Sequence, residues 1–234
     1  MKNLIVASTS TLHGGKYLDY LGEVLSHHFR QTDEILFIPF ARPGGISHND
    51  YTARAAAVFQ EIGKKVVGLH TFKDPLEALE NARGIFTGGG NTFLLVKELH
   101  EKKLMQPLRD AIFYGTPYLG TSAGSNICGL TMQTTNDMPI VRPPSFKTLG
   151  VLPFNINPHY LDPDPNSKHM GETRETRIKE FHTQNQLPVI GLREGSWLQV
   201  TGDTIILKGN LSARVFEHGK APYEITSGTK IDTF

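Results

Sequence analysis

The sequence predicts an α/β fold with a mostly parallel sheet, and three observations support this. Strand-like apolar runs alternate with helix-like segments through the first half of the chain, a rhythm typical of parallel strands joined by crossover helices. The length of 234 residues suits one domain with a substantial core, spanning residues 1–234. The last quarter is rich in short strand-like runs, with Gly202-Asp203 as a two-residue hairpin turn.

The spacing of apolar residues gives the elements in order. Strands are expected at residues 4–7, 34–40, 65–70, 84–87 and 117–119, and the helices between them at residues 16–29, 51–62 and 93–100. A further short helix is expected to begin at Asp74-Pro75. Proline is favoured in the first turn of a helix, because the amide hydrogen that it lacks would have no partner there. Later in the chain, residues 140–141 resemble a strand, a polar helix runs from about residue 174 to residue 184, and strands are expected at residues 188–192, 197–201, 204–207 and 214–217.

Composition and charge exclude several classes of protein. The 24 Lys and Arg residues nearly balance the 23 Asp and Glu residues, which does not suggest a nucleic-acid or membrane partner. The single cysteine, Cys128, excludes a disulfide framework and a multi-thiolate metal site. Residues 1–8 read as a first strand and not as a signal peptide, so we expect a cytoplasmic protein.

One pentad carries the strongest chemical signal. Gly120-Thr121-Ser122-Ala123-Gly124 follows the apolar run of residues 117–119, and a serine between small residues at a strand-to-helix turn is the nucleophile-elbow pattern. Amides at a helix start are unpaired, so the Ala123 amide could bind an oxyanion that forms beside Ser122. The alternative is a turn that is glycine-rich for packing alone.

A second glycine-rich turn ends an earlier strand. Three consecutive glycines, Gly88, Gly89 and Gly90, follow residues 84–87, and such a run suits a backbone that approaches a ligand. No Gly-Lys-Ser/Thr completes a phosphate-binding loop. We expect the amide of Gly89 or Gly90 to be the second oxyanion donor, because both loops lie at the carboxyl edge of a parallel sheet. A tight turn without a function is the alternative.

A serine nucleophile needs a base and a group that orients this base. His159 is the favoured base because Asn157-Pro158 and Tyr160 place it in a non-helical loop, although a structural role is the alternative. Asp137 and Glu194 are both candidates for the orienting acid, and the residues alone do not choose between them. No HExxH motif is present, and no metal site is expected.

At these residues the chain resembles peptidase E, the α-aspartyl dipeptidase family of serine peptidases. The resemblance implies the fold of the class I glutamine amidotransferases (flavodoxin-like), a three-layer α/β/α sandwich with serine at the elbow. Five blocks in the expected order carry it: Phe86-Thr87-Gly88-Gly89-Gly90-Asn91-Thr92, Gly120-Thr121-Ser122-Ala123-Gly124-Ser125-Asn126, Thr134-Thr135-Asn136-Asp137-Met138-Pro139-Ile140, Asn157-Pro158-His159 and Gly171-Glu172-Thr173-Arg174.

The resemblance implies Ser122 as nucleophile and His159 as base, with Asp137 or Glu194 as the third member. It further implies a dipeptide substrate with amino-terminal aspartate, Asp-X, and an aspartyl-enzyme intermediate without any cofactor. Arg174 is the expected partner of the substrate's β-carboxylate, because its planar fork suits bidentate binding. Arg174 could instead pair with a glutamate on the surface of its own helix. We expect a monomer or a homodimer.

The sequence leaves two other functions open. One is a related serine hydrolase of the same fold with a different acidic substrate, such as a cyanophycinase-like enzyme. The other is a non-catalytic protein that uses the glycine loop to bind a small anion.

Overall fold

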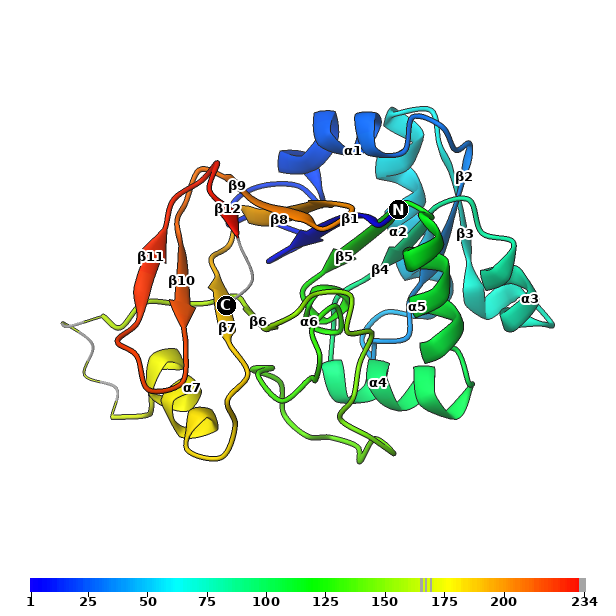
Figure 1. The fold of residues 1–234 in the computed structure, drawn as a ribbon. Helices are drawn as coiled ribbons and strands as arrows, with labels where there is room; N and C mark the ends of the chain where they lie inside the picture. Colours follow the sequence, from blue (N-terminus) through cyan, green and yellow to red (C-terminus); the bar gives the residue numbers. More distant parts are fainter. Residues whose placement is uncertain (165, 167, 169, 232–234) are drawn as a thin grey trace.

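A computed structural model describes residues 1–231 except residues 165, 167 and 169 (Figure 1). Its larger sheet has eight strands in the order β12-β9-β8-β1-β5-β4-β2-β3. Five neighbouring strands, from β1 to β3, are parallel, whereas β8 and β9 pair antiparallel. The strands are β1 (Asn3–Ala7), β2 (Glu34–Ile38), β3 (Lys65–Gly68), β4 (Ile85–Thr87), β5 (Tyr118–Thr121), β8 (Ser196–Thr201), β9 (Thr204–Gly209) and β12 (Lys230–Ile231).

Helices cover both faces of this sheet, because its central strands are apolar on both sides. In β1, Leu4 and Val6 belong to one buried cluster, and Ile5 and Ala7 belong to another. The first cluster includes side chains of α3 (Pro75–Glu80), α4 (Thr92–Glu101), α5 (Met105–Tyr114) and α6 (Ala123–Asn126), and the second includes those of α1 (Gly22–His28) and α2 (His48–Glu61). The predicted α/β/α layering is therefore confirmed.

A smaller sheet stands beside the larger one (Figure 1). Its order is β11-β10-β7-β6, and β6 pairs parallel with β7. Buried residues of β7 and β10 belong to the same apolar cluster as Leu4 and Val6, so the two sheets share a core. The helix α7 (Arg174–His182) packs on this sheet through Ile178. The strands are β6 (Asn155–Pro158), β7 (Val189–Leu192), β10 (Ala213–Phe216) and β11 (Tyr223–Ile225).

Several local features differ from the sequence prediction, among them the following. The helix expected at residues 16–29 is shorter, because Leu18 has φ of 57° and only a 3₁₀ turn, η1 (Asp19–Leu21), precedes α1. Residues 140–141 form no strand, since prolines at 139 and 143 flank them and remove amide donors. The helix α5 was not predicted, although Gly115 ends it in the left-handed conformation that glycine favours.

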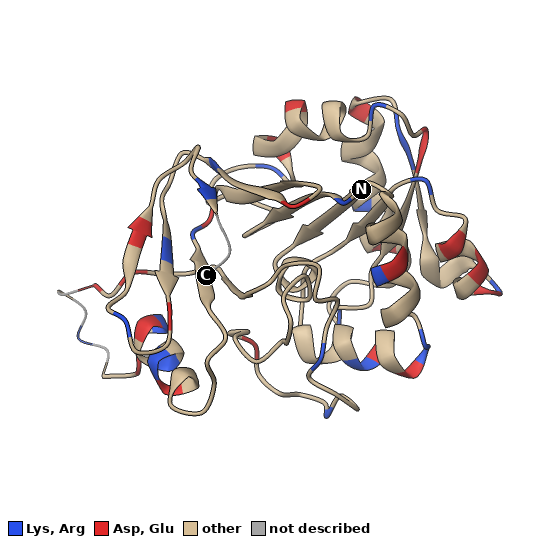
Figure 2. Cartoon of the chain, viewed as in Figure 1, with Lys and Arg blue, Asp and Glu red and all other residues tan. Residues whose placement is uncertain are grey.

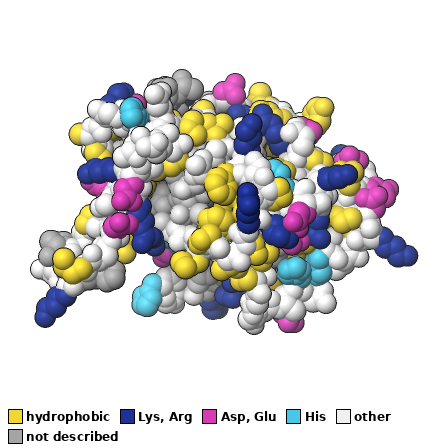
Figure 3. All heavy atoms as spheres, turned by 90° about the horizontal axis from the view of Figure 1, so that it is seen from below, with side chains coloured by type: hydrophobic (Ala, Val, Ile, Leu, Met, Phe, Trp, Pro, Cys, Tyr) yellow, Lys and Arg dark blue, Asp and Glu magenta, His cyan; other side chains and the backbone are white. Residues whose placement is uncertain are grey.

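Charged residues of both signs are interspersed over the helices, as on α7 (Figure 2). The face seen from below also mixes hydrophobic and charged side chains (Figure 3). No helix in the described part of the chain is long and apolar enough to cross a bilayer.

Buried His28 makes the stability of the fold depend on pH. Its Nε2 lies 3.1 Å from the Tyr118 carbonyl oxygen, so the neutral ring donates a hydrogen bond there, and burial lowers the pKa from 6.5 to about 4. As the pH falls below 6.5, His28 becomes protonated in the unfolded chain, whereas in the folded chain it stays neutral until the pH approaches about 4. We expect this residue to lower the free energy of unfolding by up to about 3 kcal/mol at pH 4.

Urea unfolding between pH 7 and pH 4 measures this effect. His28→Gln should make the free energy of unfolding depend less steeply on pH. His13→Gln, at an exposed position, should leave the pH dependence as it is in the wild type. An unchanged slope in His28→Gln would show that His28 is not responsible.

Candidate active site

Ser122 lies on a sharp turn between β5 and α6. Its backbone has φ of 54° and ψ of −111°, a combination that non-glycine residues rarely adopt. Close contacts impose the turn: a Cβ atom at Gly120 would overlap the Gly124 carbonyl oxygen, and one at Gly124 would overlap the Thr87 carbonyl oxygen. The glycines of the pentad are therefore required by packing, and this packing also fixes the direction of the serine side chain.

His159 lies next to Ser122. It directly follows β6, has φ of 54°, and its backbone amide donates to Ser8 Oγ over 2.9 Å. The imidazole Nε2 is 2.8 Å from Ser122 Oγ, and Nδ1 is 2.5 Å from Glu194 Oε1. With the proton on Nδ1, the ring donates to Glu194 and presents a lone pair to the serine hydroxyl.

Of the two acids that the sequence left open, Glu194 is the one beside His159. It follows β7 by two residues, and its side chain is 46% exposed, against 37% for His159. Asp137 points elsewhere. Its Oδ2 accepts hydrogen bonds from the Thr92 amide, the Thr92 hydroxyl and the Thr135 hydroxyl, at 2.7, 2.6 and 3.0 Å. Asp137 therefore does not hold the imidazole in this structure.

The glycine loop packs against the serine. An added Cβ atom at Gly89 would lie 2.9 Å from Ser122 Cβ, whereas one at Gly90 would overlap the carbonyl oxygen of Ala41. The Gly89 carbonyl is held by the Tyr51 hydroxyl at 3.2 Å. Within the described residues, the amides of Gly89, Gly90 and Ala123 have no hydrogen-bond acceptor. Gly89 is thus the loop glycine nearest to Ser122.

Arg174 is the first residue of α7, whose N-cap is Thr173. Burial is the main cause that lowers the pKa of its guanidinium; Arg177 lowers it further and Asp137 raises it. No described residue forms a hydrogen bond or ion pair with Arg174. The glutamates on either side of it have other partners: Glu172 pairs with Arg177, and Glu175 pairs with Lys179 and Arg214. Arg174 also lines a cavity of about 340 Å³, and none of Ser122, His159 and Glu194 lines this cavity.

A chain of ion pairs, which sequence reasoning missed, connects the segments that carry these groups. Arg193, next to Glu194, donates to Asp162 and to Glu224. Arg214 also contacts Glu224 and reaches Glu175, next to Arg174. Hydrogen bonding from Arg193 is the main cause that lowers the pKa of Glu224 to about 2. The paired residues of this network are 10 to 39 positions apart in the sequence, so no local motif could reveal the network.

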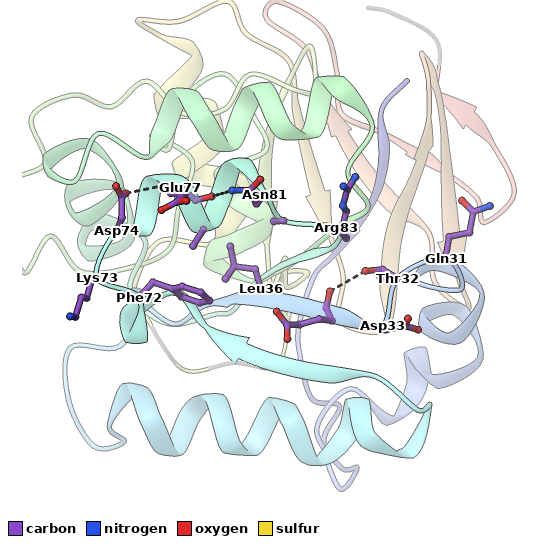
Figure 4. Close-up of a pocket in the computed structure, with 13 residues that line it drawn as sticks. Gln31, Thr32, Asp33, Leu36, Phe72, Lys73, Asp74, Glu77, Asn81 and Arg83 are labelled. Atoms are coloured by element: carbon purple, nitrogen blue, oxygen red, sulfur yellow. Dashed lines mark hydrogen bonds between the residues drawn. The ribbon is translucent and has the colours of Figure 1, made fainter.

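A larger cavity of about 900 Å³ lies elsewhere. Residues from α3 and the start of β2 line it, among them Thr32, Asp33 and Glu77 (Figure 4). These positions lie at the amino end of the parallel strands, whereas Ser122 follows the carboxyl end of β5. None of the predicted site residues lines it.

The described residues offer no group of three His, Cys, Asp or Glu side chains that could hold a metal ion. The groups that contact one another at Ser122 are its hydroxyl, the His159 imidazole and the Glu194 carboxylate.

An α/β/α fold with a serine on a strand-to-helix turn and a histidine beside it is characteristic of the serine hydrolases. The chain belongs to peptidase family S51, whose family model matches residues 4–208. It is a serine-type peptidase by this membership.

Named relatives cover almost the whole chain. It is 46% identical over 229 residues to "Peptidase E" of Streptomyces coelicolor, covering 98% of this chain and 93% of that protein. It is 45% identical to "Probable alpha-aspartyl dipeptidase" of Drosophila melanogaster, covering 92% and 90%. The crystal structure of a peptidase from an acI-B1 Actinobacterium superposes with a TM-score of 0.75 at 18% identity, covering 100% of this chain and 97% of that one; this likeness shows the fold alone.

The strained backbone at Ser122 predicts a gain in stability when its Cβ atom is removed. We expect Ser122→Gly to be more stable than Ser122→Ala by about 1 kcal/mol, because glycine adopts this backbone without strain but is more flexible when unfolded. Both variants lack the hydroxyl, so the comparison isolates the backbone. Urea unfolding of the two variants measures the difference, and equal stabilities would show that the turn stores no strain.

The two loop glycines differ in what an added methyl group would meet. In Gly89→Ala the methyl group crowds Ser122 Cβ and the Thr121 carbonyl oxygen, so kcat should fall about 100-fold and the protein should also lose about 1–3 kcal/mol of stability. In Gly90→Ala the methyl group meets Ala41 and the residue must keep φ of 145°, so the protein should lose about 2–4 kcal/mol of stability. Steady-state kinetics and urea unfolding of both variants test this. A Gly89→Ala variant with normal kcat would exclude Gly89 from the reaction site.

Proposed function

We propose that the protein is a dipeptidase that hydrolyses Asp-X through an aspartyl-enzyme on Ser122. The observation that carries this proposal is the hydrogen-bonded row Ser122, His159 and Glu194, with contacts of 2.8 and 2.5 Å. A serine hydroxyl is a weak nucleophile unless a base accepts its proton, and this row supplies the base and its orienting acid.

The steps follow from the positions of these atoms. His159 Nε2 takes the proton of the Ser122 hydroxyl as Oγ attacks the carbonyl carbon of the aspartyl residue. The oxyanion then forms beside the amides of Ala123 and Gly89, which are free to donate to it. The imidazolium, stabilised by Glu194, gives its proton to the leaving amine. The X residue departs, and an aspartyl ester remains on Ser122.

Water completes the cycle. His159 takes a proton from the water molecule that attacks the ester carbonyl, and returns it to Ser122 Oγ as aspartate leaves. Only the side chains and amides already named take part.

Selectivity for aspartate is attributed to Arg174. Its guanidinium is half-buried, lines a cavity, and has no acidic partner among the described residues. A carboxylate in reach of such a group gains two charge-assisted hydrogen bonds. The name of the Drosophila relative, an alpha-aspartyl dipeptidase, supports the same substrate.

We further propose that residues 1–234 act as one catalytic domain in the cytoplasm, as a monomer or a homodimer, without nucleic-acid or membrane partners. The shared core of the two sheets supports a single domain, and the single cysteine, which is buried, suits a reducing compartment.

Hydrolysis of a matched substrate panel tests the proposal. We expect cleavage of Asp-Leu but not of Glu-Leu, Asn-Leu or acetyl-Asp-Leu, falling to background in Ser122→Ala. Glu194→Gln should lower kcat about 10³- to 10⁴-fold, because the imidazole loses its anionic partner. Cleavage of an aspartate-arginine polymer instead of Asp-Leu would favour the cyanophycinase-like alternative. Failure of the folded protein to cleave either, or to react with a serine-directed phosphonate, would favour an anion-binding protein.

A further inference from the structure

Asp137 has one carboxylate oxygen that is fully used and one that is not. Three donors from Thr92 and Thr135 converge on Oδ2 within 3.0 Å. No described residue donates to Oδ1, and the side chain is partly exposed. The carboxylate is therefore held in one orientation, with an oxygen left free to accept a hydrogen bond.

Asp137 lies between the two loops that meet at Ser122. Its anchor Thr92 is three positions after Gly89, which packs on the serine. Its neighbour Asn136 donates to the Pro158 carbonyl oxygen over 2.7 Å, one residue before His159. The segment that carries Asp137 is thus bonded both to the start of α4, after the glycine loop, and to the end of β6, before His159.

Arg174 and Asp137 carry opposite charges, and the Asp137 carboxylate raises the pKa of the Arg174 guanidinium, against the larger effect of burial. Among the described residues, no ion pair joins the two side chains. A free amino-terminal aspartyl residue has the complementary pair, a β-carboxylate and an α-ammonium group, close together. An amino-terminal glutamyl residue has a longer distance between its two charges, and an acetylated aspartyl residue has no ammonium group.

We propose that Asp137 Oδ1 binds the α-ammonium group of the substrate while Arg174 binds its β-carboxylate. The inference rests on the proposed function for the identity of the substrate. It assigns Asp137 to recognition of the free amino terminus, so the protein acts as a dipeptidase and does not cleave inside longer chains.

A purely structural role is the competing explanation. Asp137 sits at the start of α4, where its acceptor oxygen could serve only to satisfy the Thr92 amide. Asn91 caps the same helix by accepting from the Leu94 amide over 3.1 Å, and Asp137 satisfies the Thr92 amide, so Asp137 Oδ2 does have a structural role. An asparagine at position 137 keeps an acceptor oxygen for Thr92 and removes only the charge.

Binding of L-aspartate and of succinate separates the two roles, because succinate is aspartate without the ammonium group. Calorimetry should show that the wild type binds L-aspartate more tightly than succinate. In Asp137→Asn the Kd of L-aspartate should rise about 30- to 100-fold, while the Kd of succinate changes less than about threefold. Glu98→Gln, on the same helix α4 and paired with Lys102, is the matched control and should change neither value.

Several outcomes would overturn the proposal. They are equal binding of the two ligands by the wild type, equal weakening of both in Asp137→Asn, and no change in either. If Asp137→Asn does not fold, Asp137→Gln keeps a carbonyl acceptor without the charge and is measured in the same way.

Asp-Leu hydrolysis by the wild type is scored separately. Binding of aspartate that depends on Asp137, without any hydrolysis, would leave the ammonium site standing and reject the proposed reaction. Hydrolysis of Asp-Leu together with aspartate binding that does not depend on Asp137 would support the proposed reaction and reject the ammonium site.

Discussion

The close contact between the turn after β5 and strand β4 determines the geometry of the site. Gly124 touches the carbonyl oxygen of Thr87 so closely that no side chain fits there, and Ser122 takes up a strained backbone as a result. Strain of this kind persists only where the surrounding packing enforces it. The buried strands β1, β4 and β5 provide that packing, since helices cover them on both faces.

The second sheet adds the base and the acid to this serine. The parallel register of β6 and β7 places Pro158 opposite Leu192, so the residues that follow, His159 and Glu194, leave the same edge together. The chain of ion pairs through Arg193 and Glu224 then holds the end of β7, with Arg193 in contact with the loop after His159. The site is thus assembled from two sheets, whose common core fixes the distance between them.

Local sequence predicted the parts of the fold that depend on local forces. The apolar runs predicted β1, β2, β4 and β5, and Asp74-Pro75 predicted the start of α3, because burial on both faces and helix capping leave marks within a few residues. The smaller sheet was not separated from the larger one, since short strands look alike whichever partner they choose. The sequence left both Asp137 and Glu194 open as the orienting acid for the same reason. The choice between them depends on the pairing of β6 with β7, which are more than 30 residues apart.

The central claim is that Ser122 attacks the aspartyl carbonyl and carries the acyl group. Rapid quenching of the enzyme with Asp-Leu, followed by mass spectrometry of the peptide that contains residue 122, tests it most directly. We expect a transient mass increase of one aspartyl group on Ser122. In a His159→Ala variant acylated with an activated aspartyl ester, this group should be longer-lived. Hydrolysis of Asp-Leu without any acyl group on Ser122, or with the group on another residue, would contradict it.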